Sequence, residues 1–201
     1  MMARKPNPER RTKFLDAALE LFTSHGVQNT STAAIAREAG TASGTLFLYF
    51  PTKQDLIHKL ILKIGKEQSA YINSRLSPNL SVQETFFTIW DGSLRWFQQN
   101  MEAYQYVQQV RDSGMIDKAV VQESEKYFEY YYSAIQRGLG EGLIKPYPIE
   151  LVGSALYQNI IGVMNLIREQ PDPSKQDEYI HSGFKIFWDG IKAANEENLE
   201  E

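Results

Sequence analysis

The stretch that decides the fold is Ser31-Thr32-Ala33-Ala34-Ile35-Ala36-Arg37-Glu38-Ala39-Gly40-Thr41-Ala42-Ser43-Gly44-Thr45-Leu46-Phe47-Leu48-Tyr49-Phe50. Its first half is rich in strong helix formers, and the hydroxyl of Ser31 can accept a hydrogen bond from an amide of the first turn. Gly40 stands where a helix needs a left-handed residue to stop. Beyond it, Leu46 and Phe50 lie four residues apart on one face of a second helix, which Ser43 can cap. The spacing predicts two short helices joined by a tight turn, the helix-turn-helix unit.

A longer pattern runs through the same stretch and consists of Ile35-Ala36, Ala39-Gly40, Gly44-Thr45-Leu46-Phe47-Leu48-Tyr49-Phe50 and Lys53. It resembles the consensus of the tetracycline-repressor (TetR) family of bacterial transcriptional regulators, over roughly residues 8 to 66. The resemblance implies a head whose second short helix enters the major groove of DNA. The residues that occupy the family's DNA-contacting places are Thr32, Ser43, Thr45, Phe47, Tyr49 and Lys53.

Two residues depart from the family pattern, and one position is variable. Phe47 replaces the usual tyrosine, so a hydroxyl that commonly reaches a phosphate is missing. Ala42 replaces the usual serine, so capping of the second helix falls to Ser43 or Thr41. Leu48 occupies a variable, outward position, where it either contacts a thymine methyl group or is simply exposed or packed on a neighbour. We include Leu48 among the DNA-binding candidates.

Charge is divided unevenly along the chain. Residues 1–66 hold 10 Lys or Arg against 5 Asp or Glu, a net charge of +5, whereas residues 67–201 hold 11 against 20, a net charge of −9. A small basic module on an acidic body is typical of nucleic-acid binding at one end. The absence of cysteine excludes disulfides and thiolate chemistry. No run of about 18 apolar residues occurs, so we expect a cytoplasmic protein with no membrane partner.

Helical spacing of apolar residues continues to the C-terminus, without the alternation of a strand. The expected helices after the helix-turn-helix unit cover residues 53–76, 81–100, 102–111, 117–138, 149–168 and 174–194, and one before it covers residues 8–24. The fold is therefore predicted to be all-α, with about nine helices. An N-terminal three-helix head with the start of the linking helix, residues 8–66, is expected to bind DNA. The resemblance assigns ligand binding and dimerisation to residues 67–201.

An excess of aromatic residues on consecutive helices of the body suits an apolar cavity for a ligand. The candidate ligand-binding residues are Trp90, Trp96, Tyr104, Phe128 and Tyr131. The alternative is that this aromatic stripe is ordinary core. Asp91, next to Trp90, either offsets the charge of a cationic ligand or is a solvated helix residue.

The last two helices are candidates for dimerisation, because they are apolar on more than one face and intersperse small residues with large ones. The candidate interface residues are Ala155, Ile160, Gly162, Val163, Gly183, Phe184 and Phe187. The resemblance implies that two subunits contribute two helices each. Such a twofold dimer presents two recognition helices about one DNA turn apart, so its operator should be roughly palindromic.

Catalytic signals are missing from the sequence. His25, His58 and His181 lie in unrelated segments without metal-ligand spacing, and no glycine-rich loop follows a strand. We expect no enzyme activity, no metal and no cofactor. The sequence predicts a homodimeric repressor, released from double-stranded operator DNA by a small, largely apolar or aromatic effector. The alternative is a dimeric helical protein that binds a small molecule without binding DNA.

Overall fold

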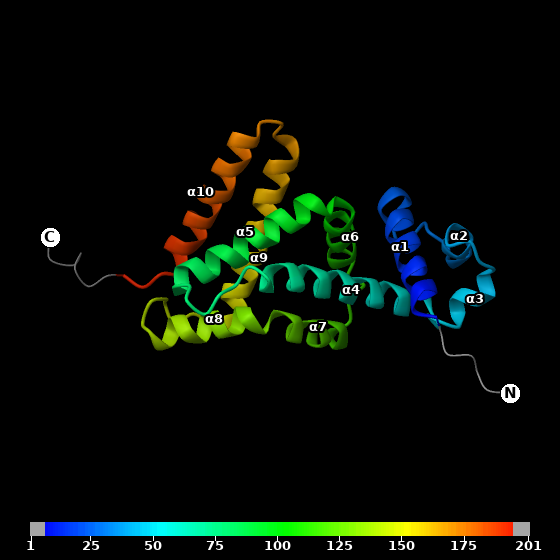
Figure 1. The fold of residues 1–201 in the computed structure, drawn as a ribbon, viewed down its shortest axis with the longest axis horizontal. Helices are drawn as coiled ribbons and strands as arrows, with labels where there is room; N and C mark the ends of the chain where they lie inside the picture. Colours follow the sequence, from blue (N-terminus) through cyan, green and yellow to red (C-terminus); the bar gives the residue numbers. More distant parts are fainter. Residues whose placement is uncertain (1–6, 195–201) are drawn as a thin grey trace. The chain divides into compact units, whose positions relative to one another are not determined.

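The N-terminal head consists of three helices (Figure 1), and the buried Phe14 belongs to its core. The computed structural model describes residues 7–194, and in it α1 covers Pro8–His25, α2 covers Thr32–Glu38 and α3 covers Ser43–Phe47. The side chain of Asn7 caps α1 by accepting a hydrogen bond from the amide of Glu9, and Pro8 occupies the first helical position. Phe14 is fully buried, 5.4 Å from the ring of Tyr49 and 6.4 Å from that of Phe50.

The rest of the described chain is also helical, which confirms the all-α prediction. The remaining elements are α4 (Lys53–Asn73), α5 (Val82–Gln99), α6 (Met101–Asp112), α7 (Lys118–Glu125), the short 3-10 helix η1 (Lys126–Phe128), α8 (Glu129–Gly140), α9 (Ile149–Glu169) and α10 (Pro173–Ile191). Within residues 7–194 the β-structure amounts to one isolated bridge, between Ile144 and Lys192. None of the described helices is long and apolar enough to cross a membrane.

The helix expected over residues 117–138 is interrupted in the structure. Its apolar spacing is continuous, but η1 separates α7 from α8. Phe128 has φ −112° and ψ 26°, outside the α-helical region, so the helix restarts at Glu129. α4 likewise ends at Asn73, three residues before the expected end.

Two compact units divide the described chain. The first contains residues up to 67 together with 100–127, and the second contains residues 68–99 and those from 128 onward. In the first unit, α6 packs on α1: the ring of Tyr106 stacks on Phe22 with centroids 5.8 Å apart, and its hydroxyl donates to the carbonyl oxygen of Ile57 at 2.8 Å. Burial raises the pKa of Tyr106, so its hydroxyl remains a donor. The assignment of separate functions to residues 8–66 and 67–201 stays a prediction.

In the second unit, α5 packs against α8, α9 and α10. The ring of Phe86 on α5 lies 6.3 Å from Tyr131 of α8 and 6.1 Å from Phe187 of α10. Trp90, one turn further along α5, is fully buried, and its indole N–H donates to the carbonyl oxygen of Ile180 at 3.0 Å. These rings give the unit an aromatic core.

A chain of ion pairs crosses the same unit. The buried carboxylate of Asp91 accepts hydrogen bonds from Arg75 at 2.8 Å and from Arg95 at 3.2 Å, and Arg95 also donates to Asp177 on α10 at 2.6 Å. Asp91 is therefore neither a solvated residue nor an unpaired carboxylate awaiting a cation. A buried carboxylate needs compensating partners, and the two arginines supply them. Through these bonds Arg75 ties the start of the α4–α5 connection to α5, and Arg95 ties α10 to α5.

Gly183 of α10 lies in close contact with α5 and α9. A Cβ atom at this position would stand 2.6 Å from Cγ2 of Val163 and 2.9 Å from Cζ2 of Trp90. We expect Gly183→Ala to lower the free energy of unfolding by about 1–3 kcal/mol, because the core is overpacked. Urea denaturation followed by circular dichroism measures this.

The matched control is Gly190→Ala on the same helix, where no atom lies within 4 Å of the added methyl group. That change should leave stability unaltered or raise it by about 0.5–1 kcal/mol through helix propensity. Equal effects of the two substitutions would contradict the close packing at Gly183.

Candidate nucleic-acid interface

The turn between α2 and α3 is built as the sequence predicts. The hydroxyl of Ser31 accepts a hydrogen bond from the amide of Ala34 at 3.1 Å and so caps α2. Gly40 has φ 69°, a conformation that side chains with a Cβ rarely adopt. The amide of Thr41 then donates to the carbonyl oxygen of Ala36 at 2.9 Å, which closes the helix end.

Capping of α3 was predicted wrongly. Ala42 is the residue before the helix, and no side chain caps it. Ser43 is the first helical residue, and the Thr41 hydroxyl donates backwards to the carbonyl oxygen of Ala36 at 3.2 Å. α3 instead owes its position to packing, because Leu46 and Phe50 are fully buried under it.

The candidate DNA-binding residues differ in exposure. Ser43 is exposed, Phe47 is 46% exposed and Leu48 is 75% exposed. Thr45 and Tyr49 are half-buried, as are Thr32 at the start of α2 and Lys53 at the start of α4. Apart from the buried Leu46, the side chains of residues 43–49 are thus exposed or half-buried at the surface of the head, in keeping with the family resemblance.

Tyr49 is held by the beginning of α1. Its hydroxyl oxygen accepts a hydrogen bond from the backbone amide of Asn7 at 3.0 Å, while its ring packs on Phe14. A tyrosine hydroxyl that accepts one bond keeps its own proton to donate. The Tyr49 hydroxyl therefore retains the capacity to donate one hydrogen bond.

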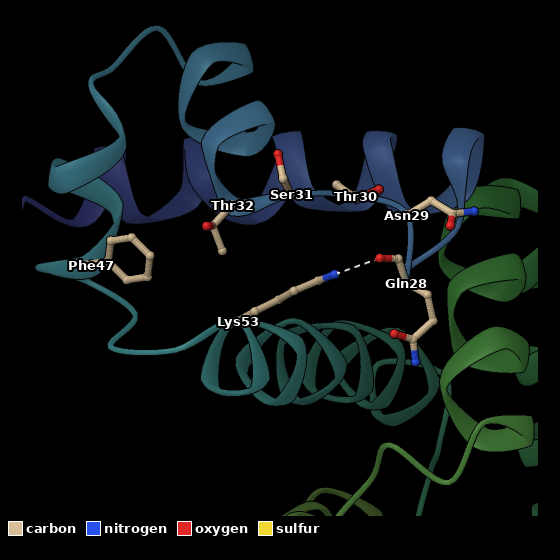
Figure 2. A pocket seen from close by; sticks show the side chains of 7 residues that line it. All are labelled: Gln28, Asn29, Thr30, Ser31, Thr32, Phe47 and Lys53. Atoms are coloured by element: carbon tan, nitrogen blue, oxygen red, sulfur yellow. Dashed lines mark hydrogen bonds between the residues drawn. The ribbon is translucent and has the colours of Figure 1, made fainter.

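An open hollow of about 440 Å³ lies beside these residues and is drawn in Figure 2. Its lining consists of Gln28, Asn29, Thr30, Ser31, Thr32, Phe47 and Lys53. Lys53 reaches across it, and its Nζ donates to the carbonyl oxygen of Gln28 at 3.4 Å (Figure 2). Partial burial lowers the pKa of Lys53, because removing water disfavours the charged form.

The hollow combines the half-buried Lys53 with the side chain of Thr32, and ammonium and hydroxyl groups both bind phosphates. Thr52 caps α4 by accepting from the amide of Asp55 at 3.0 Å, so Lys53 is held in the first turn of a regular helix. Sequence reasoning found Thr32, Phe47 and Lys53 but missed Gln28 and Asn29. These two lie in the loop before α2, where no periodicity signals a shared surface.

The candidate ligand-binding residues are not all placed in one unit. Trp90, Trp96, Phe128 and Tyr131 belong to the second unit, whereas Tyr104 belongs to the first. All but the half-buried Phe128 are buried. The hydroxyl of Tyr131 is buried without a hydrogen-bond partner among the described residues, and burial raises its pKa. Gly153 of α9 faces this hydroxyl, since a Cβ there would lie 3.3 Å from it.

The candidate dimer residues divide between the inside and the outside of the second unit. Buried within the protomer are Ile160, Val163, Gly183, Phe184 and Phe187, whereas Ala155 and Gly162 are exposed. α9 and α10 also expose large apolar side chains that sequence reasoning did not single out, namely Leu151, Leu166 and Ile186. Of the residues named here, the exposed ones are available for contact with a second chain.

No group of three or more His, Cys, Asp or Glu residues that could hold a metal ion occurs in the part of the chain that the structure describes. His58 instead lies within hydrogen-bond distance of the carbonyl oxygen of Met115, at 3.1 Å, and 3.6 Å from Asp117. His181 contacts the carbonyl oxygen of Asp177 at 2.8 Å on its own helix.

Comparison with known proteins identifies the head. Residues 14–60 match the family model described as bacterial regulatory proteins, tetR family. An uncharacterized HTH-type transcriptional regulator of Bacillus subtilis (strain 168), YhgD, is 24% identical over 158 residues, which cover 78% of this chain and 83% of that protein.

Solved structures resemble the chain over most of its length. The crystal structure of a putative tetR family transcription regulator from Shewanella sp. PV-4 has a TM-score of 0.86 and 27% identity, covering 92% of this chain and 99% of the other. A TetR family transcription regulator from Marinobacter aquaeolei VT8 shares the fold, with a TM-score of 0.81, 22% identity and coverage of 92% and 96%. The residues matched by the family model include all of α2 and α3 and also Lys53. Together with the structural likeness over most of the chain, this match shows that the chain belongs to the TetR family of bacterial transcriptional regulators.

Proposed function

We propose that this regulator is a homodimeric repressor, released from a palindromic operator by a small, largely apolar or aromatic effector. The observation that carries the proposal is the head itself. Its residues Ser43, Phe47 and Leu48 are exposed, Lys53 lines the hollow beside them, and the module has a net charge of +5. Electrostatic attraction brings such a module to the phosphate backbone, and the exposed segment then meets base edges. Its place of action is the cytoplasm, where bacterial DNA lies.

Dimerisation is supported by the exposed apolar side chains of α9 and α10. Leu151, Leu166 and Ile186 are more than half exposed, and a second surface that covered them would remove apolar area from water. Ala155 and Gly162 leave room on α9 for a second helix to approach. A twofold arrangement pairs this surface with itself and presents two heads to DNA.

The aromatic residues of the second unit support the proposed chemistry of the effector. Trp96, Phe128 and Tyr131 supply apolar surface, and the buried hydroxyl of Tyr131 has no hydrogen-bond partner within residues 7–194. Buried polar groups are normally hydrogen-bonded, so an effector with one polar atom on an aromatic or apolar body fits this environment. Release from DNA requires that the effector favour a second conformation, by roughly 1.4 kcal/mol for each tenfold loss of operator affinity.

The test is selection of bound duplexes from random DNA by the full chain at low salt, with light scattering to give the mass of the free protein. We expect an enriched, roughly palindromic sequence and a mass of two chains. A dimer that enriches no DNA sequence would favour the alternative, a small-molecule-binding protein without DNA binding. A stable monomer would contradict the proposed architecture. Screening apolar aromatic compounds for release of the selected duplex then tests the effector.

A further inference from the structure

The segment that faces DNA carries no side chain able to read a base by paired hydrogen bonds. Residues 43–49 are Ser, Gly, Thr, Leu, Phe, Leu and Tyr, without Arg, Lys, Asn, Gln, Asp or Glu. Those charged and amide groups provide the bidentate contacts that distinguish guanine, adenine and cytosine in the major groove. Serine and threonine hydroxyls bond to any base and discriminate weakly. Base discrimination by this segment therefore depends on apolar contact.

Leu48 is the side chain placed to make that contact. It is the most exposed large apolar residue of the described chain, at 75%, and it directly follows α3. Leu46 and Phe50, fully buried on either side, fix the backbone of the segment, so Leu48 is held outward. Phe47 is also exposed but faces the hollow with Thr32 and Lys53 (Figure 2), on the side where phosphate-binding groups gather.

We propose that Leu48 reads thymine by packing on its 5-methyl group, so that the operator carries thymine at one fixed position of each half-site. This inference rests on the proposed binding of operator DNA and adds the base that the head selects. The thymine methyl is the one apolar group that the major groove offers, and an exposed leucine gains by removing it from water.

The experiment replaces each thymine of the selected operator by deoxyuridine, which lacks only the 5-methyl group. Burying one such group contributes about 0.8 kcal/mol, and 1.4 kcal/mol corresponds to tenfold, so we expect about fourfold weaker binding for each contacted methyl. Replacement at the same position of both half-sites should weaken binding by about fifteenfold. Fluorescence anisotropy with Leu48→Ala should show no difference between the thymine and deoxyuridine duplexes.

Two variants serve as controls. Lys53→Ala should weaken binding to both duplexes by the same factor and keep their ratio, because a phosphate contact carries no base information. Val121→Ala changes another exposed apolar side chain of the first unit, on α7, and should alter neither affinity nor ratio. Thermal unfolding of Leu48→Ala should match the unmodified protein, since an exposed side chain contributes little to the core.

The outcomes separate this inference from the proposed function. If no duplex is enriched, both fail. If an operator is enriched but its half-sites hold no fixed thymine, the Leu48 inference alone is overturned. The same holds if deoxyuridine changes nothing, or if Leu48→Ala keeps the full penalty. The inference is supported if deoxyuridine weakens binding of the unmodified protein and of both control variants but not of Leu48→Ala.

Discussion

Lys53→Ala is expected to weaken operator binding by at least about a hundredfold. Lys53 is held in the first turn of α4, and its ammonium group reaches across the hollow bounded by Thr32 and Phe47. A hydrogen bond to a charged group contributes about 1.5–3 kcal/mol, which is tenfold or more per head, and a dimer loses two such contacts. The logarithm of affinity should also depend less steeply on the logarithm of salt concentration, by about 2 units in slope.

Lys66→Ala is the matched control, because Lys66 is an exposed lysine of the same helix outside the hollow. It should lower affinity only slightly, through the general loss of positive charge. Anisotropy titrations at several salt concentrations measure both variants on one operator. Equal losses in the two variants would show that Lys53 acts only as diffuse charge and not as a phosphate ligand.

Trp90→Ala should lower the free energy of unfolding by about 3–5 kcal/mol, as expected for truncation of a fully buried aromatic side chain. Trp90 fills the space between α5 and α10, with its ring 6.3 Å from that of Phe184 and its N–H bonded to the carbonyl oxygen of Ile180. Gly183 of α10 lies against this ring, and glycine has no side chain that could fill the cavity left by the truncation. Urea denaturation provides the measurement.

Trp90→Phe is the conservative control and should be less destabilising, since it retains most of the apolar volume and loses the indole hydrogen bond. The pair also bears on the assignment of Trp90 to ligand binding. Removing a ring that mainly lines an open cavity would change the free energy of unfolding only slightly. A decrease below about 1 kcal/mol for Trp90→Ala would therefore contradict the place of Trp90 in the core.

The head could be predicted from sequence because its determinants are local. Ser31 caps the helix that follows it, Gly40 takes a positive φ because of its own chemistry, and Leu46 and Phe50 are on one face at helical spacing. Capping of α3 failed because nearness in sequence does not fix where a hydroxyl points. Thr41 donates backwards to Ala36 instead.

The second unit could be predicted less well, because burial there depends on contacts distant in sequence. Both faces of α9 and α10 are apolar, so spacing could not separate Val163, which is buried, from Leu166, which is exposed. Asp91 likewise looks like a surface residue from sequence, because its partner Arg75 lies before α5. Its other partner, Arg95, is on the same helix and is itself paired with Asp177 on α10. Only tertiary packing decides these cases.

The central claim is that the two heads of one dimer bind the duplex together. Its most direct test is to measure the affinity of the full chain for the selected palindrome and for a duplex in which one half-site is scrambled. Two joined heads predict that the palindrome binds two chains and is at least about a hundredfold tighter, because the second head binds at a high effective concentration. Equal affinity for both duplexes, or one chain on the palindrome, would contradict the account.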